Sequence, residues 1–219
     1  MAKKTKAHQI YKTSAGKRVS GATTVIGGNL GWNKNVLMAW ARREAMAGND
    51  PDKIRDNAAD IGTLCHYMAE CHIKNEEPDI GDYSKNDIDK AENGFLKFLE
   101  WEKKMGLEYV DSELMLVSDK YEFGGTIDLM ARSNNELYLI DFKTSKGIYP
   151  DHKIQLAAYF TLYVECLGVT PDKVHILKFS KDDTGSFEDH NIGIDELRFY
   201  WKIFEHCLAL HKLKKEGGL

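Results

Sequence analysis

Apolar side chains recur at helical spacing in several parts of the chain. In residues 35–48, Val36, Leu37, Trp40 and Ala41 form one stripe, and a Gly-Asn-Asp-Pro turn signal at the end stops the pattern. Four other segments show a comparable period. The predicted helices are residues 35–48, 52–74, 87–105, 151–167 and 195–213. Each is expected to bury one face against a common core.

Shorter segments rich in β-branched and aromatic residues, bounded by turn residues, predict strands. They are residues 112–118, 123–133, 136–144 and 174–179. Asn134-Asn135 joins the second and third of these, and it suits a two-residue hairpin because Asn tolerates the positive φ of such turns. Helices, a hairpin, a helix and a further strand predict an α/β fold with a mixed central sheet flanked by helices.

The composition is that of one folded domain: 42% of the 219 residues are hydrophobic and 29% are charged. We expect a mobile start (1–10), a mainly helical entry region (11–110), a sheet core (111–182) and a helical closure (183–219). No apolar run approaches a membrane span, and no secretory signal is evident, so a soluble intracellular protein is expected. The four cysteines lack metal-site spacing and are expected to be reduced and mostly buried.

Charge is distributed unevenly along the chain. The net charge of −4 alone argues against a protein that coats nucleic acid. However, residues 1–43 contain nine of the 30 basic residues and no acidic residue. Residues 44–219 then contain 21 basic and 34 acidic residues, a net charge of −13. This asymmetry indicates a basic arm for a polyanion.

The hairpin brings acidic residues together. If Ser133 pairs with Glu136, Asp128 lies directly opposite Asp141, and Thr126 lies opposite Lys143. Like charges at such positions destabilise a sheet unless something offsets the repulsion, and a divalent cation would do so. Asp141 and Lys143 share a face, while Ile140 and Phe142 point into the core. A surface strand with an Asp/Lys salt bridge is the alternative, and spacing alone does not distinguish the two.

Four motifs occur in a set order along the chain. They are Gly62-Thr63-Leu64-Cys65-His66, Gly125-Thr126-Ile127-Asp128, Asp141-Phe142-Lys143-Thr144 and Gln155-Leu156-Ala157-Ala158-Tyr159. With these motifs the sequence resembles the PD-(D/E)xK nuclease superfamily, and specifically its RecB-like exonuclease branch, which includes phage exonucleases and mitochondrial genome maintenance exonuclease. The resemblance implies a restriction-endonuclease-like core.

The resemblance also assigns roles to residues. Asp128, Asp141 and Lys143 would be catalytic, with Lys143 positioning the attacking water. His66, Asp128, Asp141 and the Phe142 carbonyl would hold the metal, and Glu113 and Glu70 are possible additional site residues. The residues expected to contact DNA are Gln155, Tyr159, Thr144, Lys146, Lys17, Arg18, Arg42 and Arg43. The other reading is structural: a hydrogen-bonded histidine at position 66, helix packing by Gln155 and Tyr159, and a solvated lysine at position 146.

The expected function is a DNA nuclease that depends on one or two Mg²⁺ or Mn²⁺ ions. An exonuclease that leaves 5′-phosphates at single- or double-stranded ends, in DNA recombination, repair or replication, is favoured. A sequence- or structure-specific endonuclease and a catalytically silent nucleic-acid-binding module are the alternatives. No iron–sulfur cluster, nucleotide cofactor or membrane contact is expected, whereas a homo-oligomer or a recombination or replication partner is possible. The resemblance places the protein in the cytoplasm of a bacterial or phage-infected cell rather than in the mitochondrial matrix.

Overall fold

The computed structural model describes residues 9–179 and 186–219, so most of the expected mobile start lies outside the described residues. The strands are β1 (Tyr11–Lys12), β2 (Arg18–Gly21), β3 (Glu108–Ser118), β4 (Phe123–Ser133), β5 (Glu136–Lys143), β6 (Lys173–Phe179) and β7 (Phe187–Asn191). The helices are α1 (Ala22–Asn29), α2 (Lys34–Met46), α3 (Pro51–Lys74), α4 (Lys85–Met105), α5 (Pro150–Leu167) and α6 (Ile194–Glu216). All five predicted helices and all four predicted strands are present.

The seven strands form one mixed sheet, as predicted. Its order is β1-β2-β4-β5-β6-β7, and β3 pairs with the other edge of β4. The β2–β4 and β5–β6 pairs are parallel, and the other pairs are antiparallel. Strands β1, β2 and β7 and helix α1 were not predicted. The entry region and the C-terminal closure are therefore less purely helical than expected.

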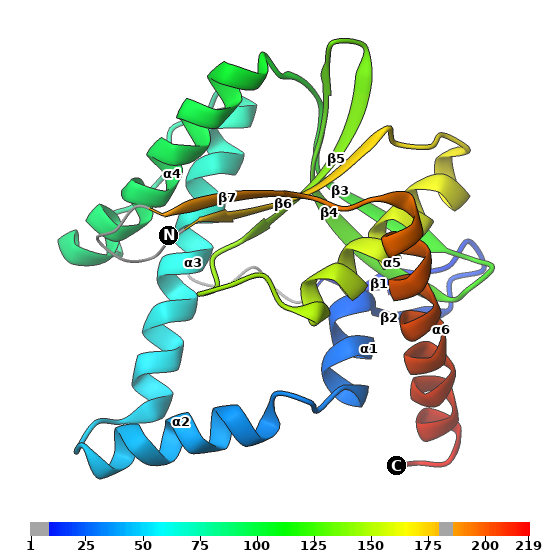
Figure 1. Ribbon diagram of the computed structural model, residues 1–219. Helices are drawn as coiled ribbons and strands as arrows, with labels where there is room; N and C mark the ends of the chain where they lie inside the picture. Colours follow the sequence, from blue (N-terminus) through cyan, green and yellow to red (C-terminus); the bar gives the residue numbers. More distant parts are fainter. Residues whose placement is uncertain (1–8, 180–185) are drawn as a thin grey trace.

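Helices cover both faces of the sheet (Figure 1). One core lies between the sheet and α1, α5 and α6, and it includes Ile127, Leu139 and Phe204. The other lies between the sheet and α3 and α4, and it includes Leu129 and the fully buried Phe98. The aromatic residues of α4 therefore serve packing, and each face of the sheet has its own hydrophobic core.

The hairpin between β4 and β5 has the predicted turn and register. Asn134 and Asn135 both have positive φ, 49° and 66°, and Ser133 pairs with Glu136. The β4–β5 ladder then ends at the pair Leu129↔Ile140, one pair short of Asp128 and Asp141. The ladder therefore does not reach Thr126 and Lys143, and the expectation that it sets them opposite each other was wrong.

Helix α2 differs from the expected packing. The helix forms, but none of its residues is buried, and Val36 and Leu37 of its apolar stripe are 70% and 53% exposed. Figure 1 shows α2 linking α1 to α3 at a distance from the sheet. Periodicity therefore predicted the helix correctly but not its environment.

Two further expectations concern the cysteines and membrane association. All four cysteines are free, and Cys65, Cys71 and Cys207 are buried while Cys166 is exposed. Within the described residues, no helix is both long and apolar enough to cross a membrane.

Candidate active site

One edge of β4 is left bare at the centre of the sheet. Strand β2 pairs with this strand at Phe123 and Gly124, and β5 pairs with it from Leu129 onward. Among residues 9–179 and 186–219, no strand pairs with this edge between Gly125 and Asp128. The gap places Asp128 where two strands diverge, so a carboxylate can enter the plane of the sheet.

Asp128 uses this gap. Its Oδ2 accepts a 2.7 Å hydrogen bond from the backbone N–H of Phe142, in place of a ladder carbonyl. The strand is also irregular here, because Ile127 and Leu129 are two residues apart yet belong to cores on opposite faces. Across the strand, Glu113 falls at the register position opposite Asp128 and has a positive φ of 53°. The backbone is therefore kinked where Asp128 reaches the β5 backbone.

Asp141 and Lys143 form the buried ion pair of the site. The Asp141 side chain is 1% exposed and that of Lys143 14%. Asp141 Oδ2 contacts the Lys143 ammonium but receives no well-oriented hydrogen bond in the part of the chain that the structure describes. Burial raises the pKa of Asp141 from 3.8 to about 6, although the Lys143 charge opposes the rise and the Asp128 charge adds to it.

The Lys143 ammonium lies beside two atoms of the expected metal site. It contacts Asp141 Oδ2 and also lies 3.4 Å from the Phe142 carbonyl oxygen. These are two of the atoms that the sequence resemblance assigns to a metal ion. A positive charge therefore already lies where the expected cation would be held.

His66 approaches the same region from α3. Its ring meets the Phe142 ring edge-on, with centroids 5.8 Å apart, and its charge acts on the Asp141 carboxyl. Within the described residues, no group of three or more His, Cys, Asp or Glu side chains is arranged to hold a metal. The carboxylate and carbonyl oxygens nevertheless have the chemistry that Mg²⁺ and Mn²⁺ prefer, so the ligand set remains a proposal.

Helix α5 places Tyr159 within electrostatic reach of Asp141 and Asp128, with Gln155 beside it. Gln155 Nε2 donates a 2.6 Å hydrogen bond to the Tyr159 hydroxyl. Burial and the charges of Asp141 and Asp128 raise the pKa of Tyr159 well above its usual value. A Cβ at Gly125 would lie 2.6 Å from Tyr159 Cε1, so the glycine lets the ring lie against β4. The DNA contacts expected of Gln155 and Tyr159 remain predictions.

Three residues near the site were missed at the sequence level. Tyr11 of β1 hydrogen-bonds to Thr126 Oγ1 at 3.0 Å, two residues before Asp128. The pKa of His152 is lowered to about 4, chiefly by burial and also by the positive charge of the nearby Lys143. Lys178 interrupts an apolar strand, which was the available sequence signal, and its side chain is 5% exposed.

The two possible additional acids, Glu70 and Glu113, both lie near Lys74 of α3. Glu70 forms a 2.7 Å ion pair with Lys74, one turn further along α3. Glu113 also acts electrostatically on Lys74, after the nearer Glu70. This pairing gives Glu70 a structural role besides the possible orientation of His66.

The residues expected to contact DNA outside α5 lie on several elements. Lys146 is exposed on the loop after β5, and Thr144 lies in the same loop. Lys17 forms a 2.6 Å ion pair with Glu122, which reduces its availability. Arg18 of β2 and Arg42 and Arg43 of α2 are exposed and are accessible to a polyanion.

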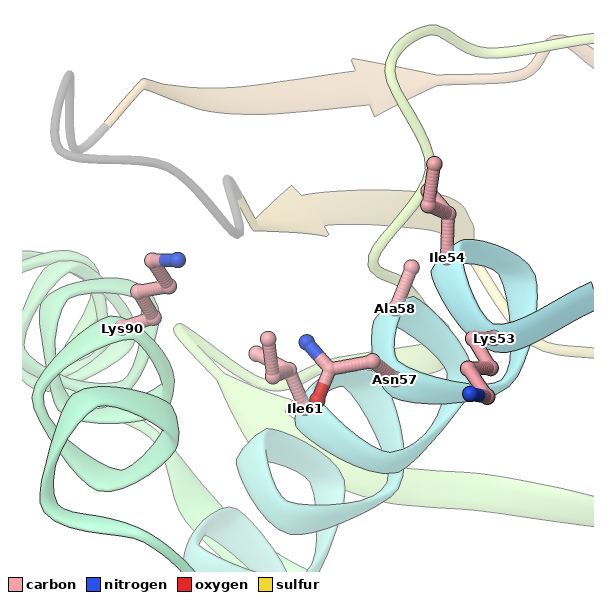
Figure 2. A pocket seen from close by; sticks show the side chains of 6 residues that line it. All are labelled: Lys53, Ile54, Asn57, Ala58, Ile61 and Lys90. Atoms are coloured by element: carbon pink, nitrogen blue, oxygen red, sulfur yellow. The ribbon is translucent and has the colours of Figure 1, made fainter. Parts of the chain in front are cut away.

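A pocket of about 390 Å³ lies outside this group of residues. Figure 2 shows it between α3 and α4, with Lys53, Ile54, Asn57, Ala58, Ile61 and Lys90 lining it. Ile61 precedes His66 by five residues on α3, about 7.5 Å along the helix axis. The pocket is therefore separate from the acidic site, although one helix contributes to both.

No protein family and no curated protein matches the chain. Among solved structures, a candidate exonuclease from Eubacterium rectale matches with a TM-score of 0.53 and 11% identity, over 72% of this chain and 68% of that chain. The chain has an exonuclease-like fold. This finding confirms the predicted fold class, a mixed central sheet flanked by helices.

A second structure is similar over a greater length. An alkaline exonuclease from Laribacter hongkongensis, solved in complex with dAMP, matches over 91% of this chain and 93% of that chain, at 11% identity and a TM-score of 0.39. This score is too low to add to the assignment. The exonuclease-like fold thus rests on the first match, and the activity has to be argued from the residues of the site.

Proposed function

We propose that the protein is a metal-dependent DNA nuclease of the exonuclease type. The observation that carries the proposal is the position of Lys143: its ammonium contacts the buried Asp141 carboxylate and the Phe142 carbonyl, beside Asp128 and at the gap in β4. The exonuclease-like fold supports the choice of reaction class.

The donor set suits a hard divalent cation. Asp128 and Asp141 supply carboxylates, Phe142 supplies a carbonyl, and His66 lies next to Phe142. A bound Mg²⁺ or Mn²⁺ would supply charge stabilisation at the phosphate and activation of water. One or two ions are compatible with this set. In the proposed reaction, a water oxygen bonds to phosphorus, the bond to the 3′ oxygen breaks and that oxygen takes up a proton, leaving a 5′-phosphate.

Residues of the chain would orient this reaction. Asp141 would hold the cation when one is bound, and the Lys143 ammonium beside it would then be available to the phosphate and the attacking water. Tyr159 and Gln155 hold each other by a hydrogen bond on the face of α5 that borders the acids. Tyr159 is a neutral donor at neutral pH, and burial raises its pKa further, so we expect its hydroxyl to serve as a donor beside the DNA backbone.

Substitution of the three proposed catalytic residues tests the function. Asp128→Ala, Asp141→Ala and Lys143→Ala are each expected to reduce cleavage of DNA in Mg²⁺ by about 100-fold or more. Asp195→Ala, at a side chain that is 92% exposed on α6, serves as the matched control and should cleave normally. Full activity in all three site variants, with circular dichroism confirming their folding, would exclude this site.

Metal dependence has a readout that does not require cleavage. A ligand that binds only the folded protein stabilises it according to its concentration. Mg²⁺ should therefore raise the melting temperature of the wild type, and Asp141→Asn should abolish most of that increase. An equal increase in both proteins would place the ion elsewhere.

An endonuclease and a silent binding module remain the alternatives. Cleavage of closed DNA circles would indicate the endonuclease, whereas DNA binding without cleavage under any metal condition would indicate the module. We also propose, on the sequence resemblance alone, that the substrate is a DNA end in recombination, repair or replication. An oligomeric state or a protein partner would follow from sedimentation of the protein with and without DNA.

A further inference from the structure

A second buried lysine lies beside Lys143. In the parallel β5–β6 pair, Lys143 and Lys178 are direct partners, so their side chains leave the sheet on the same face. Neighbouring strands are only about 4.8 Å apart, and like charges directly opposite each other are destabilising. The side chains are 14% and 5% exposed, which limits screening by water. Two ammonium groups placed in this way require anions.

The structure shows what balances each charge. Lys143 contacts Asp141, whereas Lys178 forms an ion pair with Glu188, its direct partner on β7. The Lys178 ammonium also lies 3.5 Å from the carbonyl oxygen of Lys146, in the loop after β5. The Glu188 side chain is 53% exposed, so Lys178 is held by a carboxylate that water can readily solvate. Glu188 can therefore be exchanged for another anion at low cost.

The balance of charge around Lys143 and Lys178 would change when a cation binds to Asp141. If Asp141 binds a cation, as in the proposed function, Lys143 loses its partner. Two buried ammonium groups would then lie beside Glu188, the carboxylate that the described residues place against Lys178, and Lys146 adds a further positive charge on the adjoining loop. The anion that a nuclease brings to this position is a phosphate of its DNA.

We propose that Lys178 is a second phosphate-binding residue, which acts with Lys143 on non-bridging oxygens of one DNA phosphate. The inference rests on the proposed function for the identity of the anion. Glu188 holds the Lys178 ammonium in place before DNA binds, and the phosphate then replaces Glu188. The Lys146 carbonyl contact keeps the loop beside this phosphate.

A purely structural role makes a different prediction for Glu188. If Lys178 serves only to join β6 to β7, removal of either partner breaks the same ion pair and both variants should behave alike. If Lys178 binds phosphate, Glu188 competes with the DNA. Removal of its charge should then leave DNA binding unchanged or strengthen it, while removal of the Lys178 charge weakens it.

The experiment measures binding of a fluorescent oligonucleotide with phosphorothioate linkages, which resist hydrolysis, to the full chain. The Mg²⁺ concentration is fixed and the concentration of monovalent salt is varied. Lys178→Met should weaken binding by about tenfold, as expected for the loss of one charged contact. It should also reduce the slope of log K against log salt by about 0.7 to 0.9. Lys178→Arg should restore most of both, and Glu188→Gln should bind at least as tightly as the wild type.

Lys173→Met is the matched control, because Lys173 lies on the same strand and pairs with Glu136 at 3.2 Å, at the end of β6 remote from Lys143. Its binding should equal that of the wild type. Wild-type binding by Lys178→Met, or equal weakening by Glu188→Gln, overturns the proposal. If Lys178→Met does not fold, Glu188→Gln decides: tighter binding than the wild type supports the inference, and unchanged or weaker binding overturns it.

The outcomes separate this inference from the proposed function. A wild type that binds DNA but cleaves none in Mg²⁺ refutes the nuclease, while the binding constants of the variants still test Lys178. Conversely, loss of cleavage in Asp141→Ala together with unchanged binding by Lys178→Met supports the nuclease and rejects the second phosphate-binding residue.

Discussion

The burial of Asp141 predicts a specific dependence of stability on pH. The pKa of this carboxyl is 3.8 in its ordinary state and about 6 in the folded protein, chiefly because the side chain is removed from water. Between these two values the folded protein keeps a proton that the unfolded chain has lost. The free energy of unfolding contributed by this group therefore falls as the pH rises from about 4 to about 6, and the full cost persists above that.

The magnitude follows from the difference between the two pKa values. Each unit corresponds to about 1.4 kcal/mol, so ionisation of Asp141 costs about 3 kcal/mol in total. Because the group is already partly ionised in the unfolded chain at pH 4, about 2 kcal/mol of this cost falls between pH 4 and pH 7. Asp141→Asn removes this titration, including the contact with Lys143 that strengthens as Asp141 ionises. Packing changes caused by the asparagine do not titrate and are the same at every pH in this range. The prediction therefore concerns the slope and not the offset.

Urea unfolding in EDTA at pH 4, 5, 6 and 7 measures this slope. The free energy of unfolding of Asp141→Asn minus that of the wild type should increase by about 2 kcal/mol from pH 4 to pH 7, mostly below pH 6. Asp195→Asn, at an exposed carboxylate, should give a flat difference. A flat or decreasing difference for Asp141→Asn would refute the claim that burial raises the pKa of this carboxyl.

Three further predictions concern the backbone and the basic residues. Gly125→Ala should cost about 1–3 kcal/mol in urea unfolding and reduce cleavage, because its Cβ would displace Tyr159. Gly27→Ala, in α1 with nothing within 4 Å, should be near neutral or stabilising, and equal effects would reject this packing argument. Glu113→Gly should leave the free energy of unfolding unchanged or raise it by up to about 1 kcal/mol, because glycine relieves the strain of the positive φ at this position. Glu108→Gly on the same strand should lower the free energy of unfolding. A lower free energy of unfolding in both variants would contradict the backbone strain at Glu113. Neutralising the basic residues of the entry region should reduce the slope of log K against log salt for DNA binding by about one to four, according to how many of them contact phosphate. An unchanged slope would show that these residues do not contact the DNA. The residues to neutralise are Lys17, Arg18, Arg42 and Arg43.

Local signals predicted most elements of the fold. The amphipathic periods of α3 and α4 give helices that pack on one face of the sheet, and Asn134-Asn135 sets the register of the hairpin because both residues tolerate positive φ. The same register brings Asp128 and Asp141 near each other on the two adjoining strands. These features depend on residues close together in sequence, so a pattern can reveal them.

The gap in the sheet depends on residues far apart in sequence. Strand β2 reaches the edge of β4 from about 100 residues upstream, and a parallel pair of only two residues leaves no periodic signal. Lys178 becomes a neighbour of Lys143 only because β6 returns in parallel after α5. For the same reason, the exposure of α2 could not be anticipated, since its apolar stripe resembles that of a buried helix.

The most direct test of the central claim is digestion of end-labelled linear DNA and closed circular DNA by the wild-type protein, in Mg²⁺ and in EDTA. A metal-dependent exonuclease should release 5′-phosphorylated products from linear DNA in Mg²⁺ and leave the circles intact, with no cleavage in EDTA. Unchanged linear DNA under all metal conditions, or equal cleavage in EDTA, would contradict the account.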